Sequence, residues 1–128
     1  MGYRPQHVRH TDFDAASARR RTHELPALPE PPTAPLVRPD RMAPGVYDAP
    51  GERGPRIPHD VGAVGLDDLP ESRRTAPPPT TVRQPVAEMA VTALRLLVRL
   101  MDGDRPENTR TELSTTPVER ASAAAPRI

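Results

Sequence analysis

Proline restricts the folding of this chain more than any other residue type. It accounts for 19 of the 128 residues, roughly threefold its average share of about 5%. Each proline lacks a backbone N–H donor and disfavours a helical conformation in the residue before it. Six prolines fall within residues 24–39, so we predict an extended or irregular stretch there. Residues 70–80 are predicted to form a second proline-rich loop.

The clearest regular element is a predicted helix from about Pro85 to Met101. Its apolar residues recur at spacings of three and four and therefore share one helix face. They are Val86, Met89, Ala90, Ala93, Leu94, Leu97, Leu100 and Met101. The other face carries Glu88, Thr92, Arg95 and Arg99. Proline suits a first helical turn and Gly103 is placed to end the helix. Such an apolar face must be buried against other protein surface.

A short apolar run, residues 60–66, has the composition of a buried parallel strand. Its two glycines are expected to weaken it. Asp67 and Asp68 follow directly and place two carboxylates at the carboxyl end of the strand. Open α/β sheets usually bind their ligands at this edge, so Asp67 is a candidate for ligand binding.

The segment after residue 39 is predicted to form a less stable helix. Asp40 is expected to cap a helix from Arg41 to about Arg53, because a carboxylate accepts hydrogen bonds from the free N–H groups of a first turn. Pro50 costs this helix about 3 kcal/mol, and its glycines cost about 1 kcal/mol each. A marginal helix from Asp14 to Glu24 and a short strand from Thr111 to Thr115 are also predicted.

Composition excludes several classes of function. The chain has no cysteine and a formal net charge of +1, so it has no disulfides or thiolate metal sites and only a weak attraction to nucleic acid. The spacing His7-x-x-His10, with Asp12 nearby, does not define a metal site. Neither a catalytic triad nor a phosphate-binding glycine loop is recognisable. We expect no enzyme activity, no metal and no cofactor.

No signal peptide or membrane span is recognisable, which predicts a cytoplasmic chain without membrane contact.

An ordered series of short motifs resembles the LacI/GalR family of bacterial transcriptional regulators. The motifs are Pro31-Pro32-Thr33-Ala34, Arg41-Met42-Ala43-Pro44-Gly45-Val46-Tyr47-Asp48-Ala49, Gly54, Ile57-Pro58-His59-Asp60-Val61, Val64-Gly65-Leu66-Asp67-Asp68 and Pro79-Thr80-Thr81-Val82-Arg83-Gln84-Pro85. In the family the corresponding strings run P-T-A-I-F, D-x-M-A-x-G, G-x-x-x-P-x-D-V, V-G-F-D-D and P-x-L-T-T-V-x-Q-P, followed by an amphipathic helix. Gly2-Tyr3-Arg4 resembles the start of the last third of such proteins. The series covers nearly the whole chain.

The resemblance implies an α/β fold, a partial periplasmic-binding-protein-like (Rossmann-like) sensor domain with long proline-rich irregular segments. We place that domain at residues 24–120, after a polar segment at residues 1–23 and before a disordered tail at residues 121–128. The helix-turn-helix head and most of the first lobe of the family have no counterpart. We therefore expect no direct DNA binding by this chain alone.

The resemblance also implies a function and a site. The family binds a small effector, often a sugar or a purine, in a cleft between two lobes, and this binding shifts the protein between DNA-competent and released dimers. Asp67 takes the position of a family carboxylate that binds effector hydroxyls. Asp40 and Gln84 are the other predicted effector-binding residues. The resemblance implies two partners, which are the effector and either a second copy of this chain or an intact relative.

A different class of function remains open from the residues alone. The chain could be a largely disordered proline-rich remnant or interaction segment that binds no ligand. Its only persistent structure would then be the helix of residues 85–101. A cooperative thermal transition would distinguish a folded domain from such a remnant.

Overall fold

The computed structural model describes residues 5–49, 56–106, 108 and 110–125. Its centre is a four-stranded sheet in the order β1-β2-β3-β4. The strands are β1 (Leu36–Val37), β2 (Val64–Asp67), β3 (Thr80–Arg83) and β4 (Thr116–Val118). The first three run parallel, and β4 pairs antiparallel with β3. The predicted α/β class is confirmed, and so is a strand within the Asp60–Asp68 region, although only Gly65 of the four β2 residues is buried.

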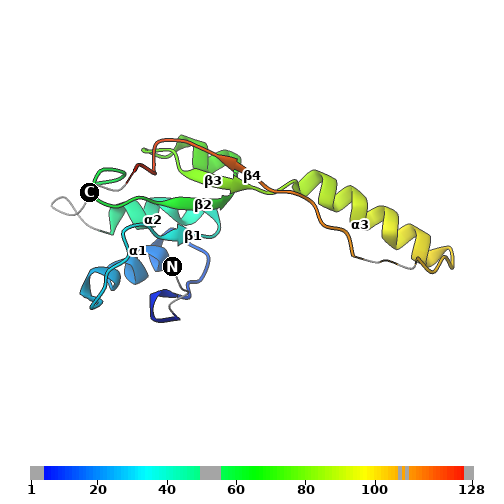
Figure 1. The fold of residues 1–128 in the computed structure, drawn as a ribbon, viewed down its shortest axis with the longest axis horizontal. Helices are drawn as coiled ribbons and strands as arrows, with labels where there is room; N and C mark the ends of the chain where they lie inside the picture. The colour runs from blue at the N-terminus through cyan, green and yellow to red at the C-terminus, as the bar shows by residue number, and fades with distance from the viewer. Residues whose placement is uncertain (1–4, 50–55, 107, 109, 126–128) are drawn as a thin grey trace.

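Two short helices lie on the same side of the sheet (Figure 1). They are α1 (Ala15–Thr22) and α2 (Ala43–Asp48). A small core of Ala18, Val37, Met42 and Val46 lies between these helices and β1, and Tyr47 and Ile57 pack against it. Because these side chains are mostly small, the helices approach closely. A Cβ atom added to Gly45 would lie 1.9 Å from the carbonyl oxygen of Ala15, so only glycine fits at this contact.

The predicted helix near residue 14 is confirmed as α1. Asp14 is its N-cap, and the side chain of Asp14 accepts a hydrogen bond of 2.7 Å from the backbone N–H of Ser17. This bond satisfies one of the free donors of the first turn. The cap and the packing on α2 stabilise a helix whose own sequence supplies little apolar surface.

The start of α2 differs from the prediction. A 3₁₀ helix, η3 (Asp40–Met42), leads into α2, which ends at Asp48 rather than near residue 53. The prediction that Asp40 caps this helix is wrong, because its carboxylate turns into the protein and accepts hydrogen bonds from other elements. Gly2-Tyr3-Arg4, Gly54 and the destabilising Pro50 and Gly51 lie outside the described residues.

The longest helix, α3 (Val86–Met101), projects away from the sheet and the other helices (Figure 1). The sequence predicted it to within one residue, and Gly103 follows it with a φ of 85°, as a terminating glycine should. None of its residues is buried, and Leu94 and Met101 are 61% and 78% exposed. The apolar face expected to be buried therefore faces solvent. Among the described residues, no helix is both long enough and apolar enough to cross a membrane.

The C-terminal part of the chain returns to the sheet. The prediction of a strand at Thr111–Thr115 is wrong. The strand in this region is β4, which begins at Thr116, and Thr116 pairs with Arg83 of β3. Part of the segment expected to be a disordered tail packs against the protein. Ser122 is fully buried, at 0% exposure. Residues 126–128 lie outside the described residues.

Candidate functional site

Asp67 and Gln84 form a polar pair where two neighbouring strands end. Asp67 is the last residue of β2, and Gln84 directly follows β3. The amide Nε2 of Gln84 donates a hydrogen bond to Oδ1 of Asp67. Both residues are partly buried. The parallel pairing of β2 with β3 thus brings two of the three predicted site residues together.

The backbone turns sharply at the end of β2. Asp67 has a φ of 108° and Asp68 a φ of 57°, a region that is uncommon for residues with a Cβ atom, although aspartate tolerates it better than bulky residues. Such conformations cost on the order of 1–3 kcal/mol each and persist only where surrounding contacts hold them. Here the two carboxylates take different partners: Asp67 binds Gln84, and Asp68 binds arginines.

Asp68 is the centre of an ion-pair network. Its side chain is only 1% exposed, and its Oδ2 lies 3.0 Å from Nη2 of Arg73 and 2.6 Å from Nε of Arg83. Arg120 donates to the other oxygen, Oδ1. Burial alone would raise the pKa of Asp68, but the hydrogen bonds from these three arginines outweigh burial and hold the pKa at about 2. The network ties β3, the segment after β4 and the 3₁₀ helix η4 (Pro70–Arg74) to the end of β2.

The third predicted residue, Asp40, lies inside the protein rather than at the surface. It is 0% exposed. Its Oδ1 accepts a hydrogen bond of 2.8 Å from the hydroxyl of Thr81, and its Oδ2 accepts one of 3.1 Å from the backbone N–H of Leu69. A Cβ atom at Gly65 would lie 2.1 Å from Oδ1. The glycine that weakens β2 as a strand therefore makes room for this carboxylate.

Two residues near the C-terminus belong to the same assembly and were missed by the sequence analysis. Besides binding Asp68, Arg120 donates a hydrogen bond of 3.0 Å to the carbonyl of Pro79. Ser122 donates through Oγ to the carbonyl of Ala63 at 2.5 Å and accepts from the N–H of Thr80 at 2.8 Å. Both residues lie in a polar, alanine-rich region without periodicity. No local pattern indicates that they return to the sheet.

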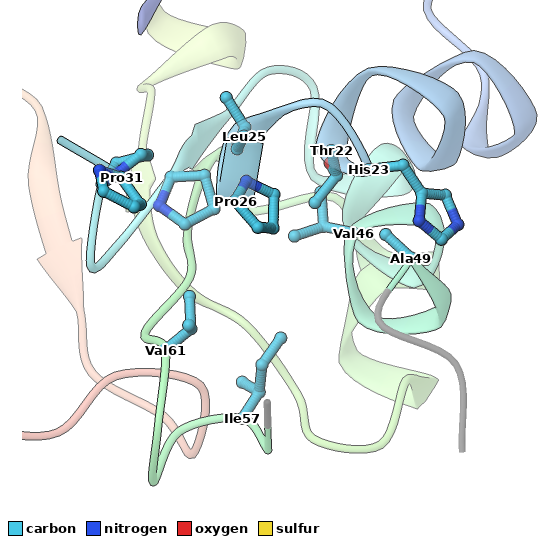
Figure 2. Close-up of a pocket in the computed structure, with 11 residues that line it drawn as sticks. Thr22, His23, Leu25, Pro26, Pro31, Val46, Ala49, Ile57 and Val61 are labelled. Carbon is cyan, nitrogen blue, oxygen red and sulfur yellow. The ribbon is translucent and has the colours of Figure 1, made fainter. Parts of the chain in front are cut away.

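Two cavities differ in their relation to these residues. An apolar cavity of about 210 Å³ lies among α1, α2 and the proline-rich segment. Leu25, Pro26, Val46 and Ile57 are in its wall (Figure 2). Neither Asp67 nor Gln84 lines it. A second cavity of about 330 Å³ lies between α3 and the returning chain, and Gln84 is part of its wall. Since ligand orientation depends on a few polar groups in a mostly apolar pocket, the second cavity is the one that adjoins the candidate site.

Comparison with known proteins gives consistent matches over nearly the whole chain. A family model described as a periplasmic binding protein-like domain matches residues 2–123. The HTH-type transcriptional repressor PurR of Erwinia tasmaniensis is 34% identical over 113 residues, covering 88% of this chain and 33% of the relative. A lac repressor dimer bound to operator and the anti-inducer ONPF superposes with a TM-score of 0.79 at 31% identity, covering 90% of this chain and 40% of that chain. A LacI family regulator from Enterococcus faecium with bound ribose superposes with a TM-score of 0.74 at 27% identity, covering 89% of this chain and 42% of that chain.

The fold and the site define a class of protein. Polar residues gathered at the carboxyl ends of parallel strands are typical of α/β domains that bind ligands. The chain belongs to the family of periplasmic binding protein-like domains, and the LacI/GalR resemblance of its motifs is confirmed. The relatives are transcriptional repressors, in agreement with the expectation that the chain is not an enzyme. The chain spans about a third of the length of the PurR relative.

Proposed function

We propose that this chain is the effector-sensing part of a LacI-type transcriptional regulator and that Asp67 and Gln84 bind a small polar effector such as a sugar. The observation that carries the proposal is the hydrogen-bonded pair of these two side chains at the ends of β2 and β3. The ribose-bound regulator from Enterococcus faecium, which shares this fold, supports a sugar-like ligand.

The chemistry of the pair suits a ligand with several hydroxyl groups. A carboxylate offers about four lone-pair sites, and Gln84 occupies one of them on Oδ1 of Asp67. The remaining sites can accept from two neighbouring hydroxyls, while the carbonyl oxygen of Gln84 offers a further acceptor. The adjoining cavity contributes apolar wall from Met89, Leu96 and Leu113, against which the carbon face of a sugar would pack.

In this proposal Asp40 positions the site and does not itself contact the effector. Its two oxygens anchor Thr81 of β3 and Leu69 just beyond Asp68. It therefore holds the ends of both strands in the positions that the Asp67–Gln84 pair requires. Its effect on an effector would pass through this backbone geometry.

We also propose that DNA binding and the completion of the ligand cleft require protein segments with no counterpart in residues 1–128. The operator-bound lac repressor supports this, because the superposition covers only 40% of its chain. In this scheme a second copy or an intact relative supplies the dimer that the regulator needs. The chain alone should show no salt-sensitive, sequence-specific gel shift.

Isothermal titration of the purified chain with a panel of sugars and nucleosides tests the site. The expected result is saturable binding of at least one compound, weakened about tenfold by Asp67→Asn because a charge-assisted hydrogen bond is lost. Asp102→Asn, at the exposed end of α3, is the matched control and should bind normally. A chain that melts cooperatively but binds nothing in the panel would refute the sensing role. A chain without a cooperative transition would favour the disordered remnant instead.

A further inference from the structure

The arginines around Asp68 carry more positive charge than their carboxylate neutralises. Three guanidinium groups, those of Arg73, Arg83 and Arg120, share this one carboxylate. Even when the nearby Asp67 is counted, the group retains a net charge of +1. A surplus of this kind at the surface attracts anions.

Two of the three guanidinium groups remain open to solvent. The side chains of Arg73 and Arg83 are 53% and 50% exposed, whereas that of Arg120 is 15% exposed. Arg73 and Arg83 both approach the same oxygen, Oδ2 of Asp68, at 3.0 and 2.6 Å, so their guanidinium groups are close neighbours. Each uses one nitrogen in this contact and has further N–H donors available. Within the described part of the chain, Asp68 is the only ionic partner of either residue.

This arrangement favours an anion on the solvent side. Two like charges held beside one carboxylate oxygen repel each other, and an oxyanion placed between their outer N–H groups would relieve that repulsion. A guanidinium group matches the geometry of phosphate and carboxylate oxygens with two parallel hydrogen bonds. Because Asp68 already holds both arginine side chains in place, less side-chain entropy is lost on binding than for two free surface arginines.

We propose that Arg73 and Arg83 form a binding site for an oxyanion of the phosphate class. The site lies at the ends of β2 and β3, beside but separate from the Asp67–Gln84 pair. It does not depend on that pair binding an effector. Since Arg83 and Gln84 are adjacent in the chain, a phosphorylated small molecule could occupy both sites together.

Titration of the full chain with inorganic phosphate at constant ionic strength, followed by NMR of the arginine Nε–H signals, tests the proposal. Saturable shifts are expected at Arg73 and Arg83. Arg73→Gln should weaken phosphate binding about tenfold, because one charge-assisted contact is lost. Arg74→Gln removes the same charge one residue later. Arg74 is exposed, and its side chain makes no hydrogen bond or ion pair with any described residue, so this control should weaken binding less than about threefold.

Equal effects of the two substitutions would overturn the site, because they would show only attraction to overall charge. Linear, unsaturable shifts in the unmodified chain would overturn it as well. Both substitutions lie in η4, and a cooperative thermal transition in each variant shows that the fold is intact. Asp67→Asn separates this inference from the proposed sensing role. It should weaken binding of a neutral sugar and leave phosphate binding unchanged or slightly stronger.

Discussion

Replacing Asp68 by asparagine should destabilise the fold by an amount that disappears in acid. Asparagine keeps the shape of the side chain and removes its charge. At neutral pH this leaves Arg120, which is only 15% exposed, and the half-exposed Arg73 and Arg83 facing a neutral amide. Three charge-assisted hydrogen bonds become weaker at once, and with them the contacts that hold Asp68 at its positive φ angle.

The magnitude follows from the pKa of Asp68. Its pKa is about 2 in the folded protein against an ordinary value of 3.8, which corresponds to about 2–3 kcal/mol at ~1.4 kcal/mol per unit. Since the folded pKa is the lower one, the charged form stabilises the fold at every pH above the ordinary value. That contribution is lost as the pH falls from about 4 to about 2.

Urea unfolding followed by circular dichroism, at several pH values between 7 and 2, measures the difference between the two proteins. We expect Asp68→Asn to lower the free energy of unfolding by about 2–3 kcal/mol at pH 7. It should have little effect at pH 2, where most of the stabilisation by the native carboxylate has already been lost. Asp12→Asn is the control, because the side chain of Asp12 is 81% exposed and lies 3.7 Å from Arg20. It should change stability by less than about 0.5 kcal/mol. A difference for Asp68→Asn that is constant with pH, or absent at pH 7, would refute the network as the source of this stability.

Three further predictions test the packing. Gly65→Ala should cost about 3 kcal/mol in urea unfolding, since its Cβ would lie 2.1 Å from Oδ1 of Asp40, whereas Gly62→Ala, with its nearest contact at 3.4 Å, should be tolerated. Ser122→Ala should lower the free energy of unfolding by about 1–3 kcal/mol, because it leaves the N–H of Thr80 and a buried carbonyl without their partner. Leu94→Gln on α3 should change the free energy of unfolding by less than about 0.5 kcal/mol, because Leu94 is 61% exposed. It should also reduce the fluorescence of a hydrophobic dye bound to the protein. A large loss of stability would show that α3 is packed.

The sequence predicted those elements whose signal is contained in one continuous stretch. The period of α3 is repeated over 16 residues, and β2 lies within an apolar run that ends in two aspartates. By contrast, β1 and β4 contain two and three residues, which is too short for any alternation to show. The fold class followed from the longer elements and from the order of the motifs.

The site was predicted only where its residues are close to strand ends. Asp67 became a candidate through the rule that ligands bind at the carboxyl edge of a parallel sheet, and Gln84 through the resemblance to the LacI/GalR family. The inward position of Asp40 depends on Leu69 and Thr81, which lie 29 and 41 residues away. The bond from Arg120 to Asp68 spans 52 residues. A local pattern cannot show such pairs. Asp40 was therefore predicted to be a helix cap and, from the resemblance, an effector-binding residue, and Arg120 was given no role.

Helix α3 shows that a periodic pattern and the burial it implies are separate predictions. The superposition on the lac repressor covers 90% of this chain, and it must include part of α3, because α3 contributes 16 of the 128 residues. The same superposition covers only 40% of the repressor chain. The remaining part of the repressor chain lies outside the superposed residues. Helix formation follows from local propensity and hydrogen bonds within the segment, whereas burial needs a second surface. For this reason the pattern located α3 correctly although its apolar face is exposed in the described part of the chain.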